Sequence, residues 1–198
     1  MNTQTKATRQ HILDTGYDLI VAKGFSNVGL SQLLQHAEVP KGSFYHYFKS
    51  KEQFGEALIN DYFANYSGRL NTLFSSEAGS AYDRLISYWQ HWLDDQQGTC
   101  GAQKCLVVKL SAEVSDLSDS MRLALLKGAT QIISSVSQCI EEGNSDGSIK
   151  VKNSQETAQL LYSLWLGASL MSKLSQDQTG LEQAMKTTKQ ILVGDPEN

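Results

Sequence analysis

Apolar residues recur at intervals of three and four positions along almost the whole chain, which is the spacing of side chains on one face of an α-helix. The alternation of apolar and polar residues that is typical of β-strands is missing. The pattern therefore predicts an all-α fold of about nine helices, three short ones followed by six that are mostly long. After a first helix that ends at Lys23, we expect the others near residues 31–37, 41–48, 51–74, 81–95, 103–114, 118–142, 153–174 and 179–193.

The helix boundaries follow from residues with known positional preferences. Lys23 and Gly24 form a basic last turn followed by a glycine suited to a left-handed cap, and Pro40 can begin a helix but not continue one. The Ser31 hydroxyl is suited to capping the second helix. Capping boxes are expected at Ser50, Asn153 and Thr179. These signals divide the chain into a small head, residues 1–50, and a larger helical bundle, residues 51–198.

Composition limits the class of protein. The 198 residues carry 17 Lys and Arg against 21 Asp and Glu, a net charge of -4, and 40% are hydrophobic. This suits a folded soluble chain of one large or two small domains. The apolar run at 157–172 is interrupted by small and polar residues, so it is not expected to span a bilayer, and residues 1–10 do not resemble a signal peptide. We therefore expect a cytoplasmic protein.

The three cysteines are odd in number and widely spaced, so the sequence does not predict a disulfide framework. Cys100 and Cys105 lack a second pair or a histidine run, so we predict no metal site and no cofactor. No histidine stands at the spacing that a thiol enzyme needs, and we expect no enzyme activity. Cys139, between Val136 and Ile140, is interpreted as a packing residue.

The segment from Leu30 to Lys51 carries the strongest functional signal. Two short helices joined by a turn of three or four residues are typical of a helix-turn-helix, whose second helix enters the major groove of DNA. The stretch 39–51 contains three lysines and no acid, and its apolar residues Val39, Phe44 and Phe48 are expected to face inward. The residues expected to face DNA are Ser31, Lys41, Gly42, Ser43, Tyr45, His46, Tyr47 and Lys51.

These side chains suit different contacts. Lys41 and Ser43 can approach base edges, and Tyr45 can contact a thymine methyl group or a phosphate. Lys51 adds positive charge at the start of the next helix, where the helix dipole already favours anions. The alternative is a plain three-helix head that binds nothing, but exposed polar-tipped aromatic residues beside a basic run argue against it.

The run 39–51, Val-Pro-Lys-Gly-Ser-Phe-Tyr-His-Tyr-Phe-Lys-Ser-Lys, resembles the DNA-binding head of the TetR family of one-component repressors. A preceding helix that ends at Gly24-Phe25 and the expected nine helices fit the same family. The resemblance implies a homodimer that binds double-stranded operator DNA. The chain departs from the family at Glu38, where glycine is most common, and at Pro40, where serine or threonine is common.

The rest of the chain resembles members of this family that respond to electrophiles and oxidants. The resemblance rests on the segments 105–114, 116–118, 121–122 and 164–168 and on Lys173 beyond them. Such repressors release their operator when a reactive small molecule modifies a cysteine, which by position would be Cys105. The regulated genes would then encode detoxifying reductases.

The residues around Cys105 give an independent reason to examine it. It is expected in the first turn of a helix, beside Lys104 and one turn before Lys109, so the helix dipole and two ammonium groups favour its thiolate. The alternative is a small core residue, because the neighbours from Leu106 to Leu110 are mostly apolar. Lys173 either traps an oxidised Cys105 or extends its amine into solvent.

The helix expected at 153–174 is apolar on nearly all sides, which requires burial against a partner subunit as well as the chain's own core. Together with the last helix it predicts a four-helix interface between two subunits. The residues expected in this interface are Leu161, Leu164, Trp165 and Ala168.

Taken together, the sequence predicts a homodimeric repressor that leaves its operator when a small electrophile or oxidant modifies Cys105. The nearest rival keeps the DNA binding but replaces covalent sensing with reversible binding of a small apolar ligand. The charges suit either function: residues 1–60 hold six basic and five acidic groups, net +1, and the remainder hold 11 and 16, net -5. The bundle would thus repel the DNA that the head binds.

Overall fold

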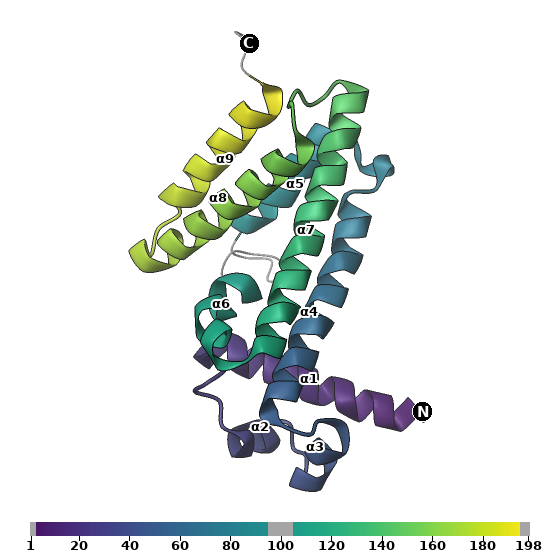
Figure 1. The fold of residues 1–198 in the computed structure, drawn as a ribbon, viewed down its shortest axis with the longest axis vertical. Helices are drawn as coiled ribbons and strands as arrows, with labels where there is room; N and C mark the ends of the chain where they lie inside the picture. Colours follow the sequence, from purple (N-terminus) through teal and green to yellow (C-terminus); the bar gives the residue numbers. More distant parts are fainter. Residues whose placement is uncertain (1–2, 95–104, 195–198) are drawn as a thin grey trace. The chain divides into compact units, whose positions relative to one another are not determined.

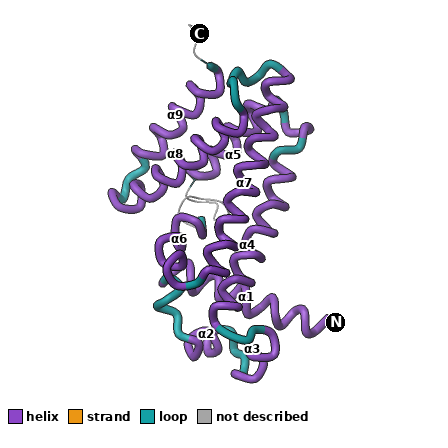
Figure 2. The backbone as a smooth tube through the Cα atoms, in the orientation of Figure 1, coloured by secondary structure: helices purple, strands orange, loops and turns teal. Residues whose placement is uncertain are grey.

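The computed structural model describes residues 3–94 and 105–194 of the chain. In these ranges every regular element is helical, which confirms the all-α prediction (Figure 2). The α-helices of the described residues are α1 (Thr3–Lys23), α2 (Leu30–His36), α3 (Lys41–Tyr47), α4 (Lys51–Leu73), α5 (Ala81–Leu93), α6 (Leu106–Leu117), α7 (Asp119–Asp146), α8 (Ser154–Ser175) and α9 (Thr179–Val193), with a short 3-10 turn, η1 (Ser76–Ala78).

The chain forms two compact units. The first comprises Met1–Ala64 and Lys109–Gly128, and the second comprises Asn65–Val108 and Ala129–Asn198. This division differs from the boundary predicted at residue 50. The first part of α4 and most of α6 belong with the head because their side chains pack on α1 and on the segment that follows it.

An aromatic cluster holds the first unit together. The ring centroids of Phe44, Phe48 and Phe54 lie 5.3 to 5.7 Å from one another, and each of these side chains is at most 1% exposed. Gly16 of α1 lies against this cluster, and a Cβ there would come within 2.3 Å of the Phe54 ring. The inward positions expected for Phe44 and Phe48 are confirmed, whereas Val39 is only half-buried.

In the second unit, α9 packs against α8 and α5, and Figure 1 shows α9 lying beside α8 at the outer edge. The indole rings of Trp89 on α5 and Trp165 on α8 stack with centroids 4.9 Å apart. Trp165 Nε1 donates a hydrogen bond to Thr188 Oγ1 of α9 at 2.9 Å. Aromatic stacking and this buried bond therefore join three helices at one point.

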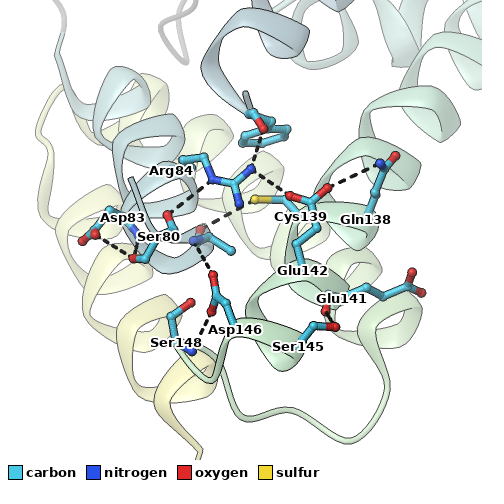
Figure 3. Close-up of polar contacts among 12 residues, drawn as sticks. Ser80, Asp83, Arg84, Gln138, Cys139, Glu141, Glu142, Ser145, Asp146 and Ser148 are labelled. Carbon is cyan, nitrogen blue, oxygen red and sulfur yellow. Dashed lines mark hydrogen bonds and ion pairs between the residues drawn. The ribbon is translucent and has the colours of Figure 1, made fainter. Parts of the chain in front are cut away.

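A buried polar network closes one end of the second unit (Figure 3). The Arg84 side chain is 4% exposed, and its guanidinium donates to the Phe74 carbonyl and to Glu142 Oε2, the latter at 2.8 Å. Asp146 accepts from the amides of Ala81 and Ser148. Because a buried cation must be paired, this network fixes where α5 meets the end of α7.

Several helix ends confirm the local sequence signals. Gly24 follows α1 with φ +85°, the left-handed conformation expected of it. The Asn153 side chain accepts from the Glu156 amide at 3.1 Å, and the Ser50 hydroxyl accepts from the Gln53 amide at 3.1 Å.

Other helix ends differ from the prediction. The second helix begins at Leu30 with Gly29 in the capping position, so Ser31 does not cap it. Thr179 is the first residue of α9 rather than its cap, and its amide donates to Asp177 instead. The predicted loop at Gly143 is helical as far as Asp146, because Ile149 packs directly on Gly143 and the left-handed turn falls at Gly147.

We predict that Arg84→Met destabilises the protein. The substitution leaves the Phe74 carbonyl without its charged donor, at a cost of about 2 kcal/mol, which for a chain of this size lowers Tm by about 4–8 °C. Thermal unfolding followed by circular dichroism measures the change. Glu142→Gln, which keeps an acceptor opposite Arg84, should cause a smaller loss, and an Arg84→Met protein as stable as the parent would contradict the role of the network.

Candidate functional site

The helix-turn-helix is held in shape by contacts from outside its two helices. His11 of α1 donates from Nε2 to the Ala37 carbonyl at 2.9 Å, which anchors the turn between α2 and α3. Glu38, in this turn, has φ +52°, a left-handed conformation that explains why glycine is common there in related sequences. This role of His11 could not be predicted from local sequence, because its partner lies 26 residues away.

The outer face of α3 carries half of the residues expected to face DNA. Lys41, Gly42, Tyr45 and His46 are exposed, and Tyr45 retains 47% of its accessible surface. The Lys41 ammonium lies 5.8 Å from the centre of the Tyr45 ring, a cation–π contact that places charge and ring side by side. We refer to these four residues as the α3 face.

The other residues expected at DNA are placed differently. Ser43 and Tyr47 are half-buried at the edges of the α3 face, and the Tyr47 ring contacts His46 with centroids 4.8 Å apart. Ser31 is exposed on α2.

Lys51 is directed inward rather than toward DNA. Its ammonium donates to the Phe25 carbonyl at 2.7 Å and lies 4.4 Å from the centre of the Phe25 ring. Partial burial lowers the pKa of Lys51, and the nearby carboxylates of Glu52 and Glu113 oppose that shift. Lys51 therefore supports the segment after α1, a role that the sequence did not predict.

Two residues of α6 bind the end of α1 and the segment that follows it. Lys109 Nζ donates to the Val21 carbonyl at 2.8 Å. The Glu113 carboxylate accepts from the amide of Phe25 at 3.0 Å and from the amide of Ser26. We refer to these three bonds as the α6 latch. A Cβ at Gly24 would lie 3.1 Å from Glu113 Oε2, so glycine also gives the carboxylate room.

Glu113 is charged in the latch over a wide pH range. Partial burial would raise the pKa of its carboxyl group, but bonds from Ser26 and Phe25 and the charge of Lys51 outweigh burial, and the pKa lies below its ordinary value of 4.5. The latch was not predictable from local sequence, since Phe25 and Glu113 are 88 residues apart.

Cys105 directly precedes the first residue of α6. The helix begins at Leu106, not at residue 103 as expected, so Cys105 flanks the first turn instead of lying within it. Its side chain is 6% exposed. The position still faces the positive end of the helix dipole, which favours a thiolate. Cys105 is therefore buried, as expected of a core residue, and it also lies next to the start of a helix, as expected of a reactive thiol.

The other cysteines differ from Cys105. Cys139 is 2% exposed on α7, and its thiol donates to the Ala81 carbonyl at 3.6 Å beside the Arg84 network (Figure 3). Burial raises the pKa of Cys139 to about 12, although the charge of Arg84 opposes the shift. The Cys139 thiolate is therefore scarcely populated at neutral pH, which agrees with a packing role. Cys100 and Lys104 lie outside the described residues.

Lys173 is exposed near the end of α8. Because Cys105 is buried, a bond between the two residues requires a change in conformation that brings them together.

Two of the residues expected at a subunit interface belong to the chain's own core. Leu161 and Trp165 are both 0% exposed within the second unit, where Trp165 contacts Trp89 and Thr188. Leu164 and Ala168 are half-buried. The exposed apolar side chains of α8 are instead Leu160, Leu170, Met171 and Leu174, which recur at helical spacing on another side of the helix.

The chain matches two family models. The model for bacterial regulatory proteins of the tetR family matches residues 12–65, and the tetracyclin repressor-like C-terminal domain matches residues 81–188. The chain belongs to the TetR family.

Relatives along the whole length agree with this TetR assignment. The HTH-type transcriptional repressor NemR of Escherichia coli strain K12 is 46% identical over 97% of this chain and 98% of its own length. The HTH-type transcriptional repressor DhaR of Mycobacterium sp. strain GP1 is 30% identical over 96% and 94%. A crystal structure of E. coli NemR in its reduced form matches with a TM-score of 0.88, covering 97% of this chain and 100% of that one.

As a TetR-family transcriptional regulator, the protein is a DNA-binding protein and not an enzyme. None of the helices in the described part of the chain has the length and apolar character needed to cross a membrane.

We predict that Glu113→Gln weakens the first unit in a pH-dependent way. A group whose pKa is depressed in the folded state stabilises that state above its unfolded pKa and loses the effect as the pH falls through the folded value. The variant should therefore have a lower Tm at pH 7, by about 3 °C if the charge is worth about 1 kcal/mol. The difference should shrink below pH 4.5, the ordinary carboxyl pKa.

Thermal unfolding of the parent and the variant at pH 7, 5 and 3.5 tests this expectation. Glu56→Gln is a matched control on α4, since Glu56 takes no part in the latch. A Glu113→Gln deficit that is equal at all three pH values would contradict the proposed charge on Glu113.

Proposed function

We propose that this TetR-family regulator is a homodimeric repressor that leaves its operator when a small electrophile or oxidant modifies Cys105. The observation that carries the proposal is the position of Cys105 directly before α6, the helix that binds the end of α1 through Lys109 and Glu113. Identity of 46% to a protein named as a transcriptional repressor supports it.

The α3 face is the part that would read DNA. Its exposed lysine and tyrosine suit base edges and phosphates, and the small Gly42 lets the backbone approach the groove. Ser31, Ser43 and Tyr47 would add contacts at its margins. Lys51 would act indirectly by holding the segment after α1. In a dimer, two such faces about 34–36 Å apart would read the half-sites of a palindrome.

Dimerisation would use the exposed side of α8 together with α9. Leu160, Leu170, Met171 and Leu174 are all at least half exposed, which is unusual for so many large apolar side chains on one helix. Leu164 and Ala168 border this surface. A second copy of the chain presents the same apolar surface and would bury both, giving the four-helix interface expected of two paired helices.

The latch gives modification at Cys105 a physical route to the head. An adduct adds atoms to the buried side chain of Cys105. Because protein interiors are closely packed, these atoms must displace neighbouring side chains. The start of α6 would shift, and Lys109 and Glu113, one and two turns further along, would move with the helix. The head would then favour an arrangement that no longer fits the operator, and the modified state need only prefer that arrangement by a few kcal/mol.

Lys173 would stabilise or trap the oxidised form of Cys105. Lys173 is exposed and Cys105 is buried, so this bond would form only in a conformation that follows oxidation. Replacement of Lys173 by Met should therefore change the response to hypochlorite and leave the response to N-ethylmaleimide intact.

Reversible binding of a small apolar ligand is a second candidate, favoured by one observation. A cavity of about 340 Å³ lies in the second unit and is lined by Tyr66, Leu70, Leu73, Tyr88 and His91, among others. Its volume is in the range of small-molecule sites.

We predict that Lys41→Ala and Tyr45→Ala each weaken operator binding about tenfold, the loss expected when one good DNA contact is removed. Gel shifts with the DNA upstream of the protein's own gene measure the affinity. Lys152→Ala removes an exposed lysine from the second unit and should bind like the parent. Equal losses from Lys41→Ala and Lys152→Ala would show that the α3 face has no special role.

We predict that Cys105→Ser abolishes operator release by N-ethylmaleimide and that Cys139→Ser retains it. Serine cannot form the thioether, whereas Cys139 holds almost no thiolate at neutral pH because of its raised pKa. Gel shifts before and after treatment, paired with intact-protein mass spectrometry, test both variants. Release that persists in Cys105→Ser would favour Cys100 or the reversible ligand instead.

A further inference from the structure

The second unit contains three buried hydrogen-bond donors without a partner in the described structure. They are Nε1 of Trp89, Nε1 of Trp92 and the hydroxyl of Tyr162. All three side chains are at most 3% exposed. The neighbouring Trp165 differs, because its indole N–H is bonded to Thr188. Each unsatisfied buried donor costs roughly 1–3 kcal/mol, so three in one cluster call for a physical explanation.

The three groups form one aromatic cluster. The centroids of Trp89 and Trp92 are 5.5 Å apart, and those of Trp92 and Tyr162 are 6.4 Å apart in an edge-to-face arrangement. An indole N–H can only donate, and a phenol hydroxyl donates readily. What the cluster lacks is therefore an acceptor, and the complementary ligand is a small flat molecule that carries an oxygen acceptor.

Cys105 belongs to the same compact unit as this cluster and interacts electrostatically with Tyr162. Burial raises the pKa of the Tyr162 hydroxyl, and negative charge on Cys105 and on Tyr88 raises it further. Of the charged groups that act on this hydroxyl, Cys105 has the largest electrostatic effect. The hydroxyl consequently stays protonated at neutral pH and keeps its ability to donate beside a thiolate.

We propose that the Tyr162 hydroxyl is the donor that binds the carbonyl oxygen of a conjugated electrophile while Cys105 Sγ attacks it. The inference rests on the proposed function in one respect, that Cys105 is the residue modified. The cavity lined by Tyr66 and Tyr88 gives such a molecule a place near the cluster, since the Tyr88 ring lies 6.4 Å from that of Trp92.

The reaction is a conjugate addition. The Cys105 thiolate forms an S–C bond to the β-carbon, the C=C π pair shifts toward the carbonyl, and negative charge collects on the carbonyl oxygen. The Tyr162 hydroxyl donates to that oxygen and stabilises the enolate. Water then supplies a proton to the α-carbon, so the product is a neutral thioether and no oxidant or reductant is consumed.

Two alkylating reagents separate this role from a merely structural one. N-ethylmaleimide adds to a thiolate through an enolate, whereas iodoacetamide loses iodide and develops no enolate. Tyr162→Phe removes only the hydroxyl, and since that hydroxyl is buried without a partner, its loss should not destabilise the fold. We expect the rate of Cys105 alkylation by N-ethylmaleimide to fall about tenfold, the loss of one hydrogen bond to a developing charge, with the iodoacetamide rate unchanged.

The rates are measured on the full-length protein by mass spectrometry of the Cys105 peptide. Tyr82→Phe is the matched control: it removes a tyrosine hydroxyl from α5 in the same unit, outside both the cavity and the aromatic cluster, and it should leave the ratio of the two rates unchanged. Equal slowing of both reagents by Tyr162→Phe would indicate altered access and overturn the inference, as would no slowing at all.

The proposed function fails under a different result. If N-ethylmaleimide alkylates Cys105 in the parent protein and the operator stays bound, Cys105 is not the switch, whatever Tyr162 contributes to the rate. A normal operator release combined with an unchanged rate ratio in Tyr162→Phe overturns the role of Tyr162 alone.

Discussion

The bond between the Glu113 carboxylate and the amides of Phe25 and Ser26 is the interaction on which the proposed mechanism depends. It joins a helix that starts beside a cysteine to the segment that leads into the helix-turn-helix. The Lys51 ammonium supports the same segment from α4 and helps to keep Glu113 charged. Because charged hydrogen bonds depend steeply on geometry, a small shift of α6 is enough to weaken them.

The second unit contains buried polar groups that are hydrogen-bonded and others that are not. The Arg84 network and the Trp165–Thr188 bond satisfy their buried polar groups and hold α5, α7, α8 and α9 in place. Three buried donors, including the Tyr162 hydroxyl, have no acceptor among the described residues. Unsatisfied groups reduce stability, but they also favour a ligand or adduct that brings an oxygen to them. On this account the unsatisfied Tyr162 hydroxyl favours the reaction at Cys105, and the latch transmits its effect.

Several features set by neighbouring residues could be predicted from sequence, although the caps expected at Ser31 and Thr179 were wrong, and features set by distant residues could not. Gly24 and Asn153 act as expected because a helix end needs only its own few residues. The composition and spacing around Lys41 and Tyr45 likewise pointed to the exposed side of α3. Leu161 and Trp165 were assigned to an interface because periodicity reveals that a face is buried without revealing what covers it. Glu113 carried no local signal at all.

Amide hydrogen exchange at Phe25 and Ser26 measures whether modification of Cys105 opens the α6 latch. Both amides donate to Glu113, so they should exchange slowly in the reduced protein and at least about tenfold faster once N-ethylmaleimide has modified Cys105. The Ala37 amide, bonded to Leu33 within the head, should keep its protection and exclude general unfolding. Unchanged exchange at Phe25 and Ser26 in a modified protein that has released its operator would contradict the latch as the route of the signal.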